Sequence, residues 1–129
     1  MKSTSTEKTI LIAEDEEINY FLLERLISIL APDIKVLHAV NGKEAVEICN
    51  KNKIHLVLMD LKMPIMDGYE ATLLIKKDYP DLPVVVQTAF CTNEEERKSA
   101  LAGSDYFLSK PITEKSFNFV IAKFFSNSQ

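Results

Sequence analysis

Long apolar runs are absent from this chain of 129 residues, and no stretch reaches the length of a membrane span. The segment from Met1 to Glu7 also contains no apolar run of the kind that a signal peptide needs. Basic clusters are missing too, because 15 Lys and Arg residues are scattered among 19 Asp and Glu residues and leave a formal net charge of -4. We therefore expect no membrane insertion, no direct nucleic-acid binding and a place in the reducing cytoplasm.

Cysteine and glycine are scarce. Cys49 and Cys91 lie far apart and in no metal-binding spacing, which favours free thiols over a disulfide or a zinc site. The three glycines, Gly42, Gly68 and Gly103, are isolated from one another. The chain therefore has no glycine-rich phosphate loop of the P-loop type.

The composition predicts one globular domain. Hydrophobic residues make up 47% of the chain and charged residues 26%, an ordinary balance for a domain with a substantial core. The sequence has no internal repeat, low-complexity tract or linker. We expect a flexible N-terminal segment over residues 1–7, a folded domain over residues 8–126 and a C-terminal tail over residues 127–129.

Short apolar runs alternate five times with amphipathic stretches of helical length. This alternation is typical of repeated βα units, in which helices cover a parallel sheet. The fold class is therefore expected to be α/β. The predicted strands run from Lys8 to Glu14, Ile34 to Val40, Ile54 to Asp60, Leu82 to Thr88 and Asp105 to Ser109.

Helical signals fill the stretches between and after the strands. A 3.6-residue apolar period predicts a first and a fifth helix that each cover the sheet with one face. Their apolar residues are Ile18, Phe21, Leu22, Leu26, Ile29 and Leu30 in the first helix, and Phe117, Val120, Ile121, Phe124 and Phe125 in the fifth. The second helix is expected to open at Asn41-Gly42, and the third to follow Asp67-Gly68 and end before Pro80. A mostly polar fourth helix, which begins near Asn93 and ends at Gly103, is expected to be loosely anchored.

Polar residues follow three predicted strands, at the edge where open α/β sheets place their ligand crevice. Asp60 ends the third strand, Glu14-Asp15 ends the first and Thr88 ends the fourth. Neighbouring carboxylates are costly unless a cation neutralises them, and their hard oxygen atoms favour Mg²⁺. Taken alone, Glu14-Asp15 is also compatible with a solvated loop or with the acidic start of a helix.

The remaining polar residues narrow the chemistry. His38 lies within the second predicted strand and His55 at the far end of the third, so neither favours zinc. Lys110-Pro111 closes the fifth strand and brings a cation to the edge where Asp60 lies. Without a phosphoryl group, Lys110 is expected to pair with Asp60.

A metal, a carboxylate nucleophile, a hydroxyl and an ammonium are the groups that phosphoryl transfer requires. We predict Asp60 as the acceptor, whose carboxylate attacks a phosphoryl phosphorus. Mg²⁺ would be held by Asp15, Asp60 and the backbone carbonyl of Lys62. Thr88 and Lys110 would hold the other phosphoryl oxygens.

These residues belong to five motifs that occur in the order and spacing of a known family. They are Glu14-Asp15, the segment from Met59 to Gly68, Thr88-Ala89, the segment from Ala102 to Phe107, and Lys110-Pro111. Through them the chain resembles the receiver domain of two-component response regulators, from Lys8 to about Phe125. The resemblance implies a flavodoxin-like (CheY-like) three-layer sandwich, with a five-stranded parallel sheet in the order 2-1-3-4-5 and five flanking helices.

The resemblance also implies a function. A histidine kinase or histidine phosphotransfer protein would pass a phosphoryl group from its own histidine to Asp60. The chain would then be a phosphoacceptor that catalyses only its own phosphotransfer and autodephosphorylation, and not an enzyme in the usual sense. Asp15 matches the direct metal ligand, and Glu14 matches the position that usually holds the metal through water. Thr88 and Phe107 match the switch pair, in which the threonine moves toward the phosphoryl group and the aromatic ring turns inward.

Three positions bear on how this chain differs from its family. Phe107 stands where a tyrosine is commonest, so any partner contact through a tyrosine hydroxyl is lost. Lys62 and Phe90 occupy two variable positions that shape the lifetime of the aspartyl phosphate in this family, and a long cation and an aromatic ring there predict slow hydrolysis. For Phe107 and Phe90, plain packing in the core or on the surface is the alternative.

Two partner surfaces follow from the resemblance. The face of the fourth helix, fifth strand and fifth helix corresponds to the usual output or homodimerisation surface. The patch on which phosphodonor helices dock corresponds to Glu17, Ile18, Asn19, Leu22, Pro111 and Ile112. For Ile18 and Leu22, packing in the core is the alternative.

Other classes fit the sequence less well. A phosphohydrolase of the haloacid dehalogenase type needs a second aspartate two residues after the first, where this chain has Lys62. A flavodoxin needs a phosphate loop after the first strand, and the segment Glu14 to Glu17 would repel a phosphate. A receiver-like module that binds partners without phosphorylation would be expected to lack part of the motif set, and none is missing. Glu14-Asp15 followed by Asn19, together with the segment Leu61 to Pro64, looks somewhat more like the receivers of hybrid histidine kinases.

Overall fold

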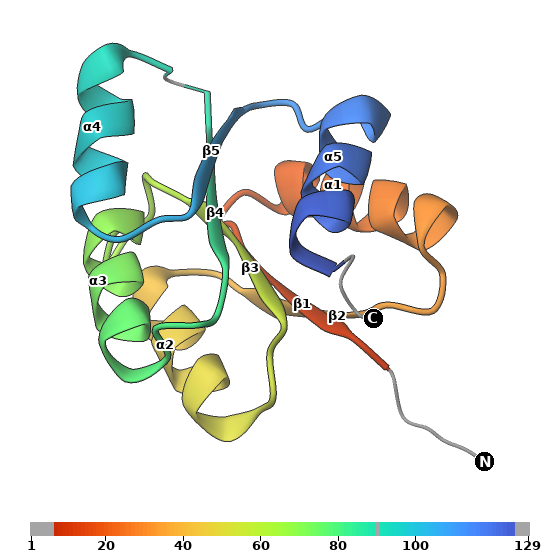
Figure 1. The fold of residues 1–129 in the computed structure, drawn as a ribbon, viewed down its shortest axis with the longest axis horizontal. Helices are drawn as coiled ribbons and strands as arrows, with labels where there is room; N and C mark the ends of the chain where they lie inside the picture. Colours follow the sequence, from red (N-terminus) through yellow and green to blue (C-terminus); the bar gives the residue numbers. More distant parts are fainter. Residues whose placement is uncertain (1–6, 90, 126–129) are drawn as a thin grey trace.

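The computed structural model describes residues 7–89 and 91–125. The strands are β1 (Thr9–Ala13), β2 (Lys35–Ala39), β3 (Leu56–Asp60), β4 (Val84–Thr88) and β5 (Tyr106–Ser109). The helices are α1 (Glu17–Leu30), α2 (Gly42–Lys51), α3 (Gly68–Asp78), α4 (Asn93–Leu101) and α5 (Glu114–Phe125). The strands form one parallel sheet in the order β2-β1-β3-β4-β5, which confirms the predicted topology. Figure 1 shows the sheet between two helical layers, with α1 and α5 on one face and α2, α3 and α4 on the other.

The three central strands are buried along their whole length, whereas the edge strands β2 and β5 are partly exposed. Helices cover both faces of the sheet, so β1, β3 and β4 carry continuous apolar runs and no alternation of polar residues. All five predicted strands agree with the observed ones to within two residues. The register pairs Asp60 with Gln87 and Thr88 with Ser109, so the polar ends of β3, β4 and β5 meet at one edge.

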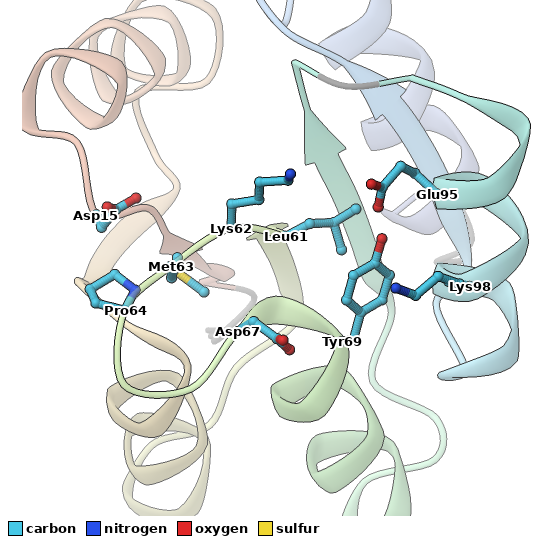
Figure 2. Close-up of a pocket in the computed structure, with 9 residues that line it drawn as sticks. All are labelled: Asp15, Leu61, Lys62, Met63, Pro64, Asp67, Tyr69, Glu95 and Lys98. Carbon is cyan, nitrogen blue, oxygen red and sulfur yellow. The ribbon is translucent and has the colours of Figure 1, made fainter.

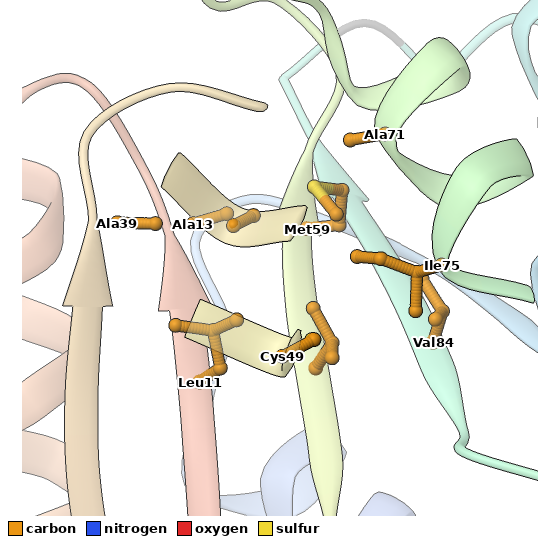
Figure 3. Close-up of a cluster of buried hydrophobic side chains, with 10 residues drawn as sticks. Leu11, Ala13, Ala39, Cys49, Met59, Ala71, Ile75 and Val84 are labelled. Carbon is orange, nitrogen blue, oxygen red and sulfur yellow. The ribbon is translucent and has the colours of Figure 1, made fainter. Parts of the chain in front are cut away.

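Two apolar clusters hold the layers together. The first joins α2 and α3 to the sheet (Figure 3) and contains Leu11, Ala13, Ala39, Ala45, Cys49, Val57, Met59, Ala71, Ile75 and Val84. The second joins α1 and α5 to the opposite face and contains Ile10, Ile12, Leu23, Ile27, Leu56, Leu58, Val85, Phe117 and Val120. Each large side chain that is fully buried in this way contributes about 1.5–3 kcal/mol to folding.

The predicted inner face of α1 is only partly correct: Leu26 and Leu30 pack against the apolar cluster, but the other four predicted residues do not. The side chains buried against the sheet are Leu23 and Ile27. Four residues assigned to that face are exposed, with relative exposures of 69% for Ile18, 52% for Phe21, 60% for Leu22 and 70% for Ile29. The helix is apolar on several sides, so a 3.6-residue period fits more than one stripe. In α5, Phe117 and Val120 are buried and Ile121, Phe124 and Phe125 pack beside them, as predicted.

Four helices begin at residues whose side chains cap the first turn. In each, a side-chain oxygen accepts a hydrogen bond from a backbone N–H three residues later, which stabilises the helix by about 1 kcal/mol. The pairs are Asn41 with Glu44 at 2.8 Å, Asp67 with Glu70 at 2.9 Å, Thr92 with Glu95 at 3.1 Å and Thr113 with Ser116 at 3.1 Å. Gly103, with φ of 105°, follows the end of α4, as predicted. Ser99 is the one buried residue of α4, in line with the prediction of a loosely anchored helix.

Two glycines let the loop after β3 pack close to its neighbours. A Cβ atom on Gly68 would lie 2.1 Å from the backbone oxygen of Asp60, and one on Gly42 would lie 2.4 Å from the backbone oxygen of Met66. Without side chains, the two N–H groups instead donate hydrogen bonds of 2.9 Å to Leu61 and Met66, respectively. Any side chain at Gly68 would push directly on the backbone of Asp60.

The two cysteines carry free thiols, Cys49 buried and Cys91 exposed. Burial raises the pKa of Cys49 to about 11, which keeps this thiol protonated and unreactive at neutral pH. Over residues 7–89 and 91–125, no helix is both long enough and apolar enough to span a membrane.

Candidate functional site

A cavity of about 290 Å³ opens at the carboxyl edge of the sheet. The residues that line it are Asp15, Glu16, Asn19, Asp60, Lys62, Thr88, Ala89 and Lys110. Five of these eight were predicted from the sequence as metal or phosphoryl contacts. They come from segments that are distant in the chain and meet because parallel strands end at the same edge.

Three carboxylates cluster at this edge of the sheet, and two of them, Asp15 and Asp60, line the cavity. One oxygen atom from each of Glu14, Asp15 and Asp60 lies within 4.8 Å of the other two. Glu14 and Asp60 are buried, with exposures of 1% and 6%, while Asp15 is exposed. A solvated loop is therefore the wrong description of Glu14. Three hard oxygen donors at this spacing fit a Mg²⁺ ion, which binds to carboxylates and retains several waters.

Lys110 provides the positive charge. Its Nζ atom lies 2.7 Å from Glu14 Oε1 and 3.3 Å from Asp60 Oδ2. The predicted pair with Asp60 is present, and Glu14 is the nearer partner. The backbone N–H of Lys110 donates a 2.8 Å hydrogen bond to the carbonyl of Thr88, which holds the lysine at the end of β4. One ammonium therefore bridges the two buried carboxylates.

Burial and charge shift the protonation of both partners. Burial, followed by repulsion from Glu14, raises the pKa of Asp60 from 3.8 to about 6. Lys110 and the backbone N–H of Lys62 act in the opposite direction and limit this rise. Burial alone would lower the pKa of Lys110, but its hydrogen bond to Glu14 and its attraction to Asp60 and Glu14 raise it. Lys110 therefore stays charged at neutral pH.

Of the two predicted switch residues, Thr88 lines this cavity and Phe107 lies on the neighbouring strand β5. Thr88 ends β4 and is 1% exposed, and Phe107 is partly buried in β5, opposite Val86. Phe90, predicted to affect the phosphoryl lifetime, lies outside the described residues. Lys62, the other residue predicted to affect the lifetime, lines the cavity.

The predicted docking patch borders the site. Ile18 and Leu22 are exposed at 69% and 60%, so the alternative of core packing is wrong for both. A cavity of about 330 Å³ lies between α1 and the segment after β5. Its lining residues are Asn19, Leu22, Leu23, Gln87, Ala89, Lys110, Pro111 and Ile112.

A second hollow beside the site was not predicted. It has a volume of about 410 Å³ and extends from Asp15 and Lys62 toward the groove between α3 and α4 (Figure 2). Tyr69 projects from α3 toward Glu95 of α4, and the Lys98 ammonium lies 4.6 Å from the Tyr69 ring centroid. Tyr69 and Lys98 are 29 positions apart, and no spacing rule connects them. Only the packing of α4 against α3 brings them together.

An open parallel α/β sheet with three carboxylates facing a lysine at its carboxyl edge defines a class of protein, the phosphoryl-accepting signalling domains with a flavodoxin-like fold. Residues 10–121 match the family model described as the response regulator receiver domain. That match covers most of the chain. The chain therefore belongs to the response regulator receiver domain family.

Individual similar proteins are consistent with this family. The chain is 36% identical over 127 residues to hybrid signal transduction histidine kinase G of Dictyostelium discoideum. The matched region covers 95% of this chain but only 4% of that kinase. It is 32% identical over 112 residues to the polar-differentiation response regulator DivK of Brucella anthropi, covering 85% of this chain and 89% of DivK. A co-crystal structure from Saccharomyces cerevisiae, of the phosphotransfer protein Ypd1 and the receiver domain of Ssk1, matches with a TM-score of 0.82 and 28% identity, covering 92% of this chain and 88% of that one.

Proposed function

We propose that this chain accepts a phosphoryl group on Asp60 from the phosphohistidine of a histidine kinase or histidine phosphotransfer protein. The single observation that carries the proposal is the position of Asp60, buried beside Glu14 and Asp15 and in contact with Lys110. Titratable groups perturbed by burial and by neighbouring like charge are concentrated at functional sites. The domain over residues 8–126 would be the unit that performs the reaction.

Mg²⁺ is the proposed cofactor. Asp15, Asp60 and the backbone carbonyl of Lys62 would hold it, with Glu14 acting through water. When bound, the ion would neutralise charge on the phosphoryl oxygens. The acidic cluster supports this assignment, because its three carboxylates present only oxygen ligands.

The chemical step uses the carboxylate of Asp60 as the nucleophile. One oxygen of Asp60 attacks the phosphorus of the donor phosphohistidine, the P–O bond forms and the P–N bond breaks, and the donor imidazole leaves with the electron pair. The ammonium of Lys110 and the hydroxyl of Thr88 would each hold a phosphoryl oxygen. Transfer to Asp60 would take Lys110 away from the carboxylate and onto the new phosphoryl group.

Phosphorylation would then change the surface of the domain. Thr88 would move toward the phosphoryl group and Phe107 would turn into the space that the threonine leaves. The face formed by α4, β5 and α5 is the proposed output or homodimerisation surface. Lys62 and Phe90 would slow hydrolysis by screening the phosphoryl group from water.

The phosphodonor would dock over α1 and the segment after β5. The proposed contacts are Glu17, Ile18, Asn19, Leu22 and Pro111. Two observations support this surface: the exposure of apolar residues of α1 and the cavity between them and Pro111. In the yeast co-crystal structure, a related receiver domain is bound to a histidine phosphotransfer protein. A cytoplasmic location stays a prediction of the sequence.

The test is intact-mass spectrometry after incubation with acetyl phosphate and Mg²⁺. We expect one added phosphoryl group on the native chain, and none on Asp60→Asn or in the presence of EDTA. Asp67→Asn is the matched control, because Asp67 is exposed in the same segment and should leave the adduct unchanged. An adduct that persists in Asp60→Asn, or no adduct on the folded native chain after a fast quench, would contradict the proposal.

A further inference from the structure

The peptide unit between Glu14 and Asp15 is held by β2. The N–H of Glu14 donates a 2.9 Å hydrogen bond to the carbonyl of Ala39, which is the last rung of the ladder between β1 and β2. The carbonyl of Glu14 lies 2.9 Å from Nε2 of His38. A carbonyl oxygen only accepts, so His38 carries its proton on Nε2 and donates. A side chain thus continues the ladder by one bond, at the point where the chain turns away toward α1.

The ring of His38 is itself fixed. It stacks on the ring of Tyr20 with a centroid distance of 3.6 Å and an interplanar angle of 9°. Tyr20 lies in the first turns of α1, only a few residues after the acidic pair. The segment from Glu14 to α1 is therefore held at both ends. At Glu14 the backbone is bonded to β2, and at Tyr20 the ring stacks on His38 of the same strand.

Fixing that carbonyl limits where the backbone can place the Asp15 side chain. A peptide unit is planar, so the position of the Glu14 oxygen sets the orientation of the N–H and Cα of Asp15. Glu14 points inward to Lys110 at 2.7 Å, whereas Asp15 is exposed at the mouth of the cavity. A rotation of this peptide would separate Asp15 from Asp60.

We propose that His38 is a positioning residue for the metal site, which acts by orienting the Glu14–Asp15 peptide, and that Tyr20 holds its ring in place. This inference depends on the proposed function, because it assumes that the three carboxylates hold Mg²⁺. Supporting contacts behind metal ligands commonly change metal affinity about 10-fold or more when they are lost. His38 lies outside the cavity itself and makes no contact that would hold the phosphoryl group.

Two substitutions separate the hydrogen bond from the stacked ring. His38→Phe keeps an aromatic ring on Tyr20 and removes the donor, whereas His38→Gln keeps a donor and removes the ring. His55→Phe is the matched control, because it removes a histidine bond to the backbone, from the N–H of Thr9 to Nδ1 at 3.0 Å, at the other end of the sheet. Each unphosphorylated variant is titrated with MgCl₂ and followed by ¹⁵N NMR, with thermal unfolding recorded in parallel.

We expect His38→Phe to weaken Mg²⁺ binding about 10-fold, His38→Gln to restore part of the loss and His55→Phe to bind like the native chain. With acetyl phosphate, the Mg²⁺ concentration for half-maximal rate should rise in His38→Phe while the rate at saturating Mg²⁺ is retained. Equal binding by all variants, or equal weakening in His38→Phe and His55→Phe, would overturn the role of His38. A folded native chain that binds no Mg²⁺ would instead overturn the proposed function, and the inference with it.

Discussion

At the scale of single residues, the charge on Asp60 reduces the stability of the folded protein. Its pKa is raised from 3.8 to about 6, so between these values the folded protein keeps a proton that the unfolded chain has released. Stability therefore falls as the pH rises through this range, and it stays lower above it. Asp60→Asn should raise the free energy of unfolding by about 1–3 kcal/mol near neutral pH.

This gain is measured by urea unfolding in EDTA. It should shrink as the pH is lowered from about 6 toward 3.8 and be absent well below that, where Asp60 is protonated in both states. Lys110 keeps Glu14 as a partner in the variant, so the substitution does not leave a buried cation unpaired. Asp33→Asn, at an exposed turn, is the control and should give no gain. A loss of stability in Asp60→Asn near neutral pH would show that its attraction to Lys110 outweighs burial.

Ile65 is a second residue that works against stability. Its φ of 71° lies in the left-handed region, which costs a residue with a Cβ about 1–2 kcal/mol, and its side chain is 79% exposed. Asparagine tolerates this conformation. Ile65→Asn should therefore raise the free energy of unfolding by about 0.5–1 kcal/mol. Ile29→Asn, at 70% exposure within α1, should give no gain, and equal effects of the two changes would contradict the argument.

The site residues differ in how well the sequence reveals them. Asp60, Thr88 and Lys110 could be brought together from the sequence, because each follows an apolar run and parallel strands end at one edge. The nearer partner of Lys110 could not be predicted from the sequence, since the 2.7 Å contact with Glu14 depends on side-chain rotamers. The hydrogen bond from His38 to the carbonyl of Glu14 could not be predicted either, for the same reason.

At the scale of elements, α4 differs from the other helices in how it is held. It buries one residue, Ser99, whereas α2 buries Gly42, Ala45 and Cys49. Elements with few buried contacts open locally at low free energy. We expect the amides of α4 to exchange with solvent faster than those of α2, with a weak dependence on urea.

Removing the cap of α4 should make this opening easier. Thr92→Ala should lower the opening free energy of α4 by about 1 kcal/mol, which is roughly a fivefold faster exchange. Asn41→Ala, the matched change at the cap of α2, should leave the amides of α2 better protected than those of α4. Hydrogen exchange followed by NMR measures both variants. Equal protection of α2 and α4 in the native chain would show that α4 opens only when the whole domain unfolds.

The two helices that pack on the same face of the sheet were not equally predictable. In α5, the predicted residues Phe117 and Val120 are buried, although Phe119 on the same helix is 51% exposed. In α1, apolar residues occur on several sides, and the sheet covers Leu23 and Ile27 but leaves Ile18 and Leu22 exposed. Periodicity identifies a helix and its possible faces, but only packing against the sheet selects one. The unselected stripe of α1 then becomes available for a partner.

At the scale of the whole molecule, the site and the proposed docking patch share a border. Asn19 and Lys110 line both the acidic cavity and the cavity beside Pro111. A donor that rests on α1 would therefore bring its histidine close to Asp60, while a small donor such as acetyl phosphate needs only the acidic cavity. The two routes to phosphorylation can be separated by changing the patch alone.

Leu22→Glu is the change that separates them. Leu22 is 60% exposed on α1, and a carboxylate there would oppose docking through an apolar contact. With a phosphorylated histidine phosphotransfer protein that labels the native chain as the donor, we expect transfer to slow about 10-fold or more, because central apolar contacts dominate most interfaces. Labelling by acetyl phosphate and the thermal unfolding midpoint should stay near native values. Leu101→Glu, at 73% exposure on α4, is the control that should transfer normally. Equal slowing of both variants, or normal transfer in Leu22→Glu, would place the donor on another surface.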